Sequence, residues 1–128
     1  MIRRHTITIA PTGADGSASG SATLSLGRPG IVRFLDVDYQ NQPATTDLVI
    51  KADSSTGQTL FTATNSNTDI TAKPVGMPGL DEGNAATAAT DGLSGGWPFG
   101  TGLYFSVAQG DGQTSGDEKV VIKVWLET

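Results

Sequence analysis

Several short segments of this chain alternate apolar and polar residues with a period of two, the pattern of β-strands that bury one face. The alternation is cleanest near the C-terminus, where every second residue from position 120 to position 126 is aliphatic. Turn residues separate these segments, and no stretch of useful length has a helical period. The pattern predicts strands in residues 4–10, 22–26, 31–39, 47–52, 58–64, 102–109 and 119–127. Antiparallel strands without helices indicate an all-β fold, either an antiparallel β-sandwich or a jelly-roll-like barrel.

The densest apolar patterning lies in residues 30–64, which hold three of the predicted strands. The first of these strands begins with apolar residues on both faces and continues with strict alternation, so that Asp36 and Asp38 project from one face. Pro43 follows the end of this strand, and a Ser/Thr/Gly turn at residues 54–57 ends the next one. Because the connections are short, we expect the three strands to pair as an antiparallel meander, whose apolar face a second sheet must cover.

A long segment, residues 65–99, interrupts the regular pattern. Its apolar groups are scattered, and it is longer than an ordinary connection in a compact domain. We therefore expect a single domain, residues 1–128, with an irregular loop insertion at about 65–99. The large apolar side chains of this insertion need a place to pack, either over one end of the barrel or against another subunit. These side chains are Met77, Leu80, Trp97 and Phe99.

The composition narrows the class of protein. The formal net charge is −5, the isoelectric point is about 4.5 and cysteine is absent, so neither a disulfide framework nor a thiolate metal site is expected. An acidic chain without an apolar span is expected to bind neither nucleic acid nor a membrane. The basic cluster of the chain is Arg3, Arg4 and His5. The alternation that follows this cluster does not fit an export signal, so we expect the mature chain to begin at or near Met1 and to fold in a cytoplasm.

The candidate catalytic and metal motifs are each incomplete. Residues 92–96 match a nucleophile elbow, but that motif needs a strand-to-helix turn and a histidine base, and His5 is the only histidine. Residues 65–69 resemble the start of a calcium loop, but the required glycine and the downstream acid are missing. Asp36 and Asp38 have the spacing of paired carboxylates without any sign of a cleft. We therefore expect no catalytic residue, no cofactor and no metal, and a protein that is not an enzyme.

Two parts of the chain share a further pattern of strand and turn residues. The first part contains PATTDLVI at residues 43–50, GQTLFT at 57–62 and NSNTD at 65–69, and the second contains LYFSVAQGD at 103–111 before a terminal strand rich in Val and Ile. This pattern resembles the small jelly-roll capsid decoration (cement) proteins of tailed bacteriophages, over about residues 30–70 and 100–127. The resemblance implies a compact domain on the outside of a phage head, often as a trimer.

The function implied by this resemblance is that of a virion structural protein on the capsid exterior, made in the host cytoplasm. Its partners would be the major capsid protein of a phage head and further copies of itself, with a homotrimer as the expected oligomer. Linked copies gain effective concentration, and binding to the assembled shell alone stabilises that shell by mass action. The subunit or capsid contacts are expected at Arg3, Arg4, Met77, Leu80, Trp97 and Phe99.

Two other functions fit the same residues. One is a carbohydrate-binding, lectin-like β-sandwich module, in which aromatic side chains stack on sugar rings. The aromatic residues available for such a platform are Trp97, Phe99, Tyr104 and Trp125, which would equally suit packing in a core or an interface. The other is a different non-enzymatic virion protein, from a tail or from head completion, because such proteins are also rich in strands and self-associating.

Overall fold

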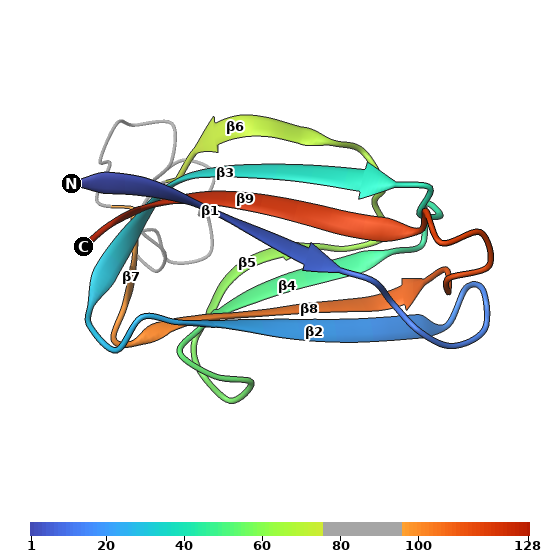
Figure 1. Ribbon diagram of the computed structural model, residues 1–128, viewed down its shortest axis with the longest axis horizontal. Coiled ribbons are helices and arrows are strands. Elements are labelled where there is room, and N and C mark those ends of the chain that lie inside the picture. The colour runs from blue at the N-terminus through green and yellow to red at the C-terminus, as the bar shows by residue number, and fades with distance from the viewer. Residues whose placement is uncertain (76–95) are drawn as a thin grey trace.

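The computed structural model describes residues 1–75 and 96–128, which form two antiparallel β-sheets in layers (Figure 1). The β9 sheet has the strand order β1-β9-β3-β6, with β7 also paired to β3, and the β8 sheet has the order β2-β8-β4-β5. The all-β sandwich that the alternation predicts is confirmed. The strands are β1 (Ile2–Ile9), β2 (Ala18–Ser25), β3 (Gly30–Gln40), β4 (Asp47–Ala52), β5 (Thr59–Ala63), β6 (Ile70–Pro74), β7 (Trp97–Phe99), β8 (Gly102–Gly110) and β9 (Lys119–Glu127).

The strand pairing follows one nested hairpin. Strand β4 pairs with β5, β3 with β6, β2 with β8 and β1 with β9, all in antiparallel orientation. The hairpin is rolled up so that β9 also pairs with β3, and β8 with β4. This connectivity is that of a jelly roll, which confirms the jelly-roll-like alternative. The expected meander is wrong, because the connection after β3 crosses between the layers and places β4 and β5 in the other sheet, where their apolar faces meet that of β3.

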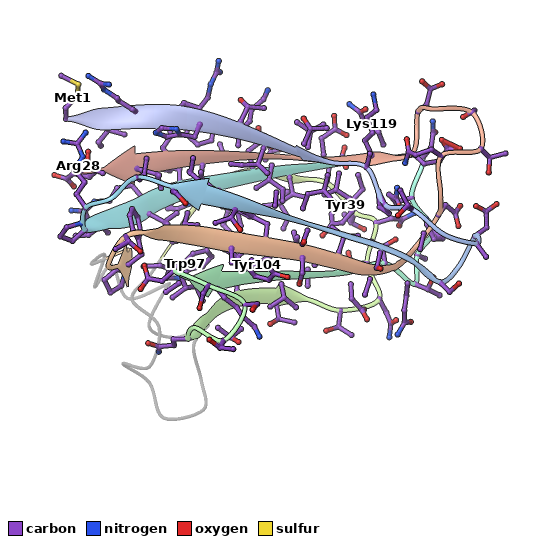
Figure 2. All side chains as sticks on the ribbon, turned by 60° about the horizontal axis from the view of Figure 1, so that its bottom comes forward. Met1, Arg28, Tyr39, Trp97, Tyr104 and Lys119 are labelled. Atoms are coloured by element: carbon purple, nitrogen blue, oxygen red, sulfur yellow. The ribbon has the colours of Figure 1, made fainter. Side chains whose placement is uncertain are left out.

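Alternate residues of both sheets form one core between the layers (Figure 2). The alternate aliphatic residues of the last strand face inward, as the alternation predicts, and so do those of β8. Ile122 of β9 and Phe105 of β8 are fully buried together with their neighbours two residues away. Burial of this apolar surface is the main source of stability for a chain that has no disulfide. Among the described residues, no helix is long and apolar enough to cross a membrane.

A β-bulge explains why the first half of β3 is apolar on both faces. The register between β3 and β9 shifts between Val32 and Phe34, so that Val32 and Leu35 both face the core. Phe34 faces outward in the same alternation as Asp36 and is 38% exposed, whereas Val32 faces the core because of the bulge. Arg33 lies in the bulge and reaches Glu127 of β9, with distances of 2.7 Å from Nε and 2.6 Å from Nη2 to Oε1.

Two strands lie within residues 65–99, which we expected to be irregular. Strand β6 pairs with residues 34–37 of β3, and β7 pairs with residues 30–32. The two short strands are therefore consecutive parts of one sheet edge. The sequence did not predict either of them, because both contain a proline and neither has a run of alternating residues.

The chain leaves and re-enters this edge at neighbouring positions. The Val75 N–H donates to the Arg33 carbonyl at 3.2 Å, and Trp97 pairs with Val32. Gly96 lies just before β7 with φ at +74°, and a Cβ there would be 2.4 Å from the Val32 carbonyl oxygen. Only glycine fits this return point without strain.

Candidate functional site

Large apolar side chains that are open to solvent gather on one side of the sandwich. Among the described residues they are Met1 (78% exposed), Ile2 (49%) and Phe34 (38%), which belong to the β9 sheet or directly precede it. Phe34 lies opposite Trp125, and their rings meet edge to face with centroids 6.4 Å apart and planes at 81°. The outer face of the β8 sheet has hydroxyl side chains instead, among them Ser21, Thr23, Thr62 and Ser106. Within residues 1–75 and 96–128, the exposed large apolar groups thus belong to one of the two sheets or precede it, which makes this sheet the candidate surface.

The solvent-facing surface of the β9 sheet, which we call the outer β9 face, is ordered in rows by the strand register. The aromatic row contains Arg4, Trp125, Phe34 and Pro74. The next row contains Thr6, Lys123 and Asp36, and the third contains Thr8, Val121 and Asp38. Lys119 and Gln40 are opposite each other in the last row. The lysines therefore lie on β9 and the aspartates on β3, beside one another along the middle of the face.

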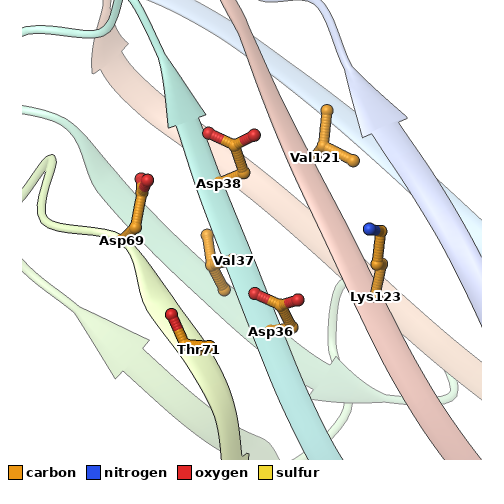
Figure 3. A pocket seen from close by; sticks show the side chains of 7 residues that line it. All are labelled: Asp36, Val37, Asp38, Asp69, Thr71, Val121 and Lys123. Atoms are coloured by element: carbon orange, nitrogen blue, oxygen red, sulfur yellow. The ribbon is translucent and has the colours of Figure 1, made fainter.

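A hollow of about 210 Å³ opens on this face between β3, β6 and β9 (Figure 3). Two of its acidic groups have structural partners: Asp69 Oδ1 accepts from the Tyr39 N–H at 2.8 Å, and Asp38 Oδ2 accepts from Gln40 Nε2 at 3.1 Å. Asp36 and Lys123 line the same hollow and make no ion pair with any residue that the structure describes. No cluster of His, Cys, Asp and Glu within residues 1–75 and 96–128 is placed to hold a metal ion.

The two chain ends lie side by side at one end of the sandwich, which we call the terminal end (Figure 1). A shallow depression of about 480 Å³ lies there, lined among others by Met1, Pro29 and Arg33. All four arginines of this acidic chain, Arg3, Arg4, Arg28 and Arg33, are at this end, and the first three are exposed (Figure 2 labels Met1 and Arg28). The terminal end therefore combines positive charge with exposed apolar groups.

The predicted contact residues fall in three different environments. Arg4 lies on the outer β9 face opposite Trp125, whereas Arg3 is on the other face of β1, where its Nε is 3.2 Å from Met1 Sδ. Met77 and Leu80 lie outside the described residues. Sequence reasoning missed Phe34 as a surface group. Its outward position follows from the same period of two that turns Asp36 outward, and Trp125 stands between Lys123 and Glu127 on the outward side of β9.

Trp97 and Phe99 are buried inside the single chain, with 7% and 5% of their surfaces exposed. Trp97 stacks on Phe61 of β5 with ring centroids 5.5 Å apart, and so joins the two sheets. Phe99 packs against Gly30, where a Cβ would lie 2.7 Å from the phenyl ring. Little surface of either ring is accessible to a partner in the folded single chain. Their part in an interface stays a prediction.

The aromatic residues considered for a sugar-stacking platform are not together. Trp97 and Phe99 are in the core, Tyr104 lies on the outer face of the β8 sheet opposite Thr23, and Trp125 lies on the outer β9 face. These four residues therefore do not form a sugar-stacking platform. The calcium-like segment at residues 65–69 is used for structural hydrogen bonds, since Asn67 Nδ2 donates to a backbone carbonyl at 2.8 Å. Residues 92–95 of the elbow match lie outside the described residues.

Asp53 lies in the turn between β4 and β5, and its side chain binds the turn between β7 and β8. Its Oδ1 accepts the N–H groups of Thr101 at 2.6 Å, Gly100 at 2.9 Å and Gly102 at 3.2 Å. The Thr101 N–H is the largest cause that lowers the pKa of Asp53, because these donors favour the charged carboxylate. All of these contacts stabilise a turn, which gives Asp53 a structural role.

Glu118 has the same role before β9. Its side chain is buried and accepts from the Ser115 N–H and the Asp117 N–H, both at 2.9 Å, and from the Ser115 hydroxyl. The Ser115 N–H is the main cause that lowers the pKa of Glu118. The Glu118 carboxylate is thus used within the chain, as is that of Asp111, which accepts from the Gly16 N–H at 3.0 Å.

Comparisons with known proteins add little to this description. No protein-family model matches the chain, and none of the curated proteins matches it. A solved structure of infectious bursal disease virus, Gx strain, is similar at 12% sequence identity and a TM-score of 0.32, over 97% of this chain and 32% of that chain. This chain thus spans about a third of the length of that one. A likeness this distant carries no conclusion about function, and the class that the structure itself defines is a jelly-roll β-sandwich.

Proposed function

We propose that this chain is a capsid decoration (cement) protein, which binds the outer surface of a phage head as an oligomer and stabilises the shell. The observation that carries this proposal is the terminal end, where the arginines of an acidic chain lie beside exposed Met1 and Ile2. A surface of this kind is complementary to an acidic protein surface with apolar patches. The strand and turn pattern that resembles cement proteins supports the same function, and the jelly roll is a fold that capsid proteins use.

The geometry suggests how such a protein would act. The tightly packed sandwich is a rigid spacer, and the terminal end presents the major capsid protein with a small contact area. A small contact binds weakly on its own, so several copies linked together would be needed to hold the shell firmly. Because the site exists only on assembled heads, binding would shift the equilibrium away from disassembly.

Co-sedimentation with purified phage heads tests this proposal. The Arg3→Glu/Arg28→Glu variant should lose head binding by at least about tenfold, because like charges across an interface are strongly unfavourable. The matched control is Lys51→Glu on the outer face of the β8 sheet, which should bind like the wild type. A wild-type protein that does not bind heads, or a double variant that binds unchanged, would contradict the proposal.

A carbohydrate-binding module is the second candidate, and one observation favours it. Phe34 and Trp125 are two neighbouring rings on an open sheet face, next to the carboxylate of Asp36. Such rings with adjacent polar groups can bind sugars. Titration with a glycan panel would then change the fluorescence of Trp125, and no change with any glycan would remove this candidate.

A further inference from the structure

We propose that the outer β9 face binds the same face of a second copy of this chain, about a two-fold axis parallel to the strands. This inference extends the self-association part of the proposed function and does not depend on head binding. It starts from the outward-facing aromatic pair of Phe34 and Trp125, and from Asp36 and Lys123 beside it, which make no ion pair with a described residue.

The first argument is that the rows of this face are self-complementary. A two-fold axis that runs between β9 and β3, parallel to the strands, places β9 of one copy over β3 of the other and keeps each row at its own level. Trp125 of one copy then covers Phe34 of the other. The aromatic rows of the two copies contact each other, and their rings become buried from solvent.

The second argument is charge complementarity in the neighbouring rows. The same axis places Lys123 over the second copy's Asp36, since these residues are opposite each other within one sheet. The second copy's Asp38 then lies over Val121, between Lys119 and Lys123, which project from the same side of β9 two residues away on either side. Each lysine therefore gains an aspartate partner, whereas neither lysine makes an ion pair with a residue that the structure describes in its own chain.

The third argument comes from the area available. Strands about 4.8 Å apart with a rise of about 3.4 Å per residue give a four-stranded face eight residues long an area of roughly 500 Å². Two such faces bury roughly 1,000 Å² together, at the lower limit of specific interfaces. The expected dimer is consequently weak and concentration-dependent. Its near-parallel strands fit the aligned class of face-to-face packing, in which mean strand directions lie within about 30° of each other.

The contact joins two copies and not three. A dimer is therefore the solution species that this face predicts, in place of the homotrimer that the resemblance implies. The outer face of the β8 sheet offers no comparable contact, because its described side chains combine hydroxyl groups with few apolar ones.

A pair of charge-reversed variants tests the proposal by analytical ultracentrifugation, from about 1 µM to about 1 mM to cover weak association. The Lys119→Glu/Lys123→Glu variant and the Asp36→Lys/Asp38→Lys variant should each self-associate at least about tenfold more weakly than the wild type. Mixed one to one, they should form a heterodimer. The introduced glutamates of one variant then face the introduced lysines of the other in one half of the interface, and native aspartates face native lysines in the other half.

Ser21→Glu/Thr23→Glu on the β8 sheet is the control and should dimerise like the wild type. Acrylamide quenching of tryptophan fluorescence gives a second readout, because Trp125 should become shielded as the wild-type concentration rises, whereas Trp97 is buried throughout. A wild-type monomer at all concentrations, a wild-type trimer, or two variants that do not associate when mixed would overturn the inference. Head binding is measured separately with the Arg3→Glu/Arg28→Glu variant, so failure of one proposal is distinguishable from failure of the other.

Discussion

Replacing Trp97 by alanine asks whether this ring belongs to the core or to an interface. The side chain is 7% exposed and stacks on Phe61 at 5.5 Å, across the two sheets. An aromatic side chain buries about 150–250 Å², which at about 25 cal/mol per Å² corresponds to about 4–6 kcal/mol as an upper bound. Truncation of a core tryptophan to alanine costs about 3–5 kcal/mol, because the cavity it leaves closes only in part.

This loss is large compared with the total stability of a domain, about 5–15 kcal/mol. With an unfolding entropy of about 2.1 cal/mol/K per residue, each kcal/mol lowers the Tm of a chain of this length by about 4 °C, so Trp97→Ala should lower it by about 10–20 °C. Urea denaturation followed by far-UV circular dichroism measures the change in the free energy of unfolding, and a thermal scan measures the change in Tm. An unchanged m value would indicate an unchanged unfolded state.

Trp125→Ala is the matched control, because the chain has two tryptophans and this one lies on the outer β9 face. Its loss removes an edge-to-face contact with Phe34 and should cost only about 0.5–1.5 kcal/mol. Equal losses for the two variants, or a loss below about 1 kcal/mol for Trp97→Ala, would refute the assignment of Trp97 to the core. Because Trp97→Ala perturbs the fold itself, head binding is better tested through Arg3 and Arg28.

Gly96→Ala should destabilise the protein by about 2 kcal/mol or more, because φ is +74° and the new Cβ would lie 2.4 Å from Ile31 Cγ2. An unchanged urea midpoint would contradict this. Asp53→Asn should cost about 1 kcal/mol at pH 7, by loss of a charged turn cap. The folded pKa of Asp53 is below its ordinary value of 3.8, so this stabilisation is present above that value and is lost as the pH falls through the folded pKa. Urea midpoints of wild type and variant should therefore converge as the pH is lowered below 3.8, and parallel curves would argue against it. Burial, with Asp69 second, raises the pKa of Tyr39 to about 12, so in a Tyr104→Phe variant the remaining phenol should ionise near 12 by absorbance while the chain stays folded.

The strands could be predicted from sequence wherever one face is buried and the other solvated. All the segments predicted from alternation are strands, and their inward faces in β8 and β9 are the ones expected. The pairing of strands could not be predicted, because a period of two specifies which side chains face inward but not which strand lies alongside. The short connection after β3 favoured a hairpin, yet it crosses to the other sheet.

The candidate surface was predictable only in part. The shared outward side of Asp36 and Asp38 and the outward position of Trp125 follow from the period of two, and the structure agrees. Phe34 shares the outward side of Asp36 by the same period, whereas Val32 faces the core only through the bulge, and Asp69 joins the hollow only because β6 pairs with β3. These two features depend on contacts between distant parts of the chain, which no local pattern encodes.

The nested pairing of the strands has a consequence for how the chain folds. Strands β4 and β5 are joined by a short turn, whereas β1 and β9 come from opposite ends of the sequence. Each pair further out must close a longer loop before its contacts form, so we expect slow folding, in milliseconds to seconds, that begins near β4 and β5. Until β1 and β9 pair, the apolar inner faces of both sheets would remain exposed to solvent. Aggregation of newly made chains is therefore expected to be most frequent in that interval, above all where many copies are made at once.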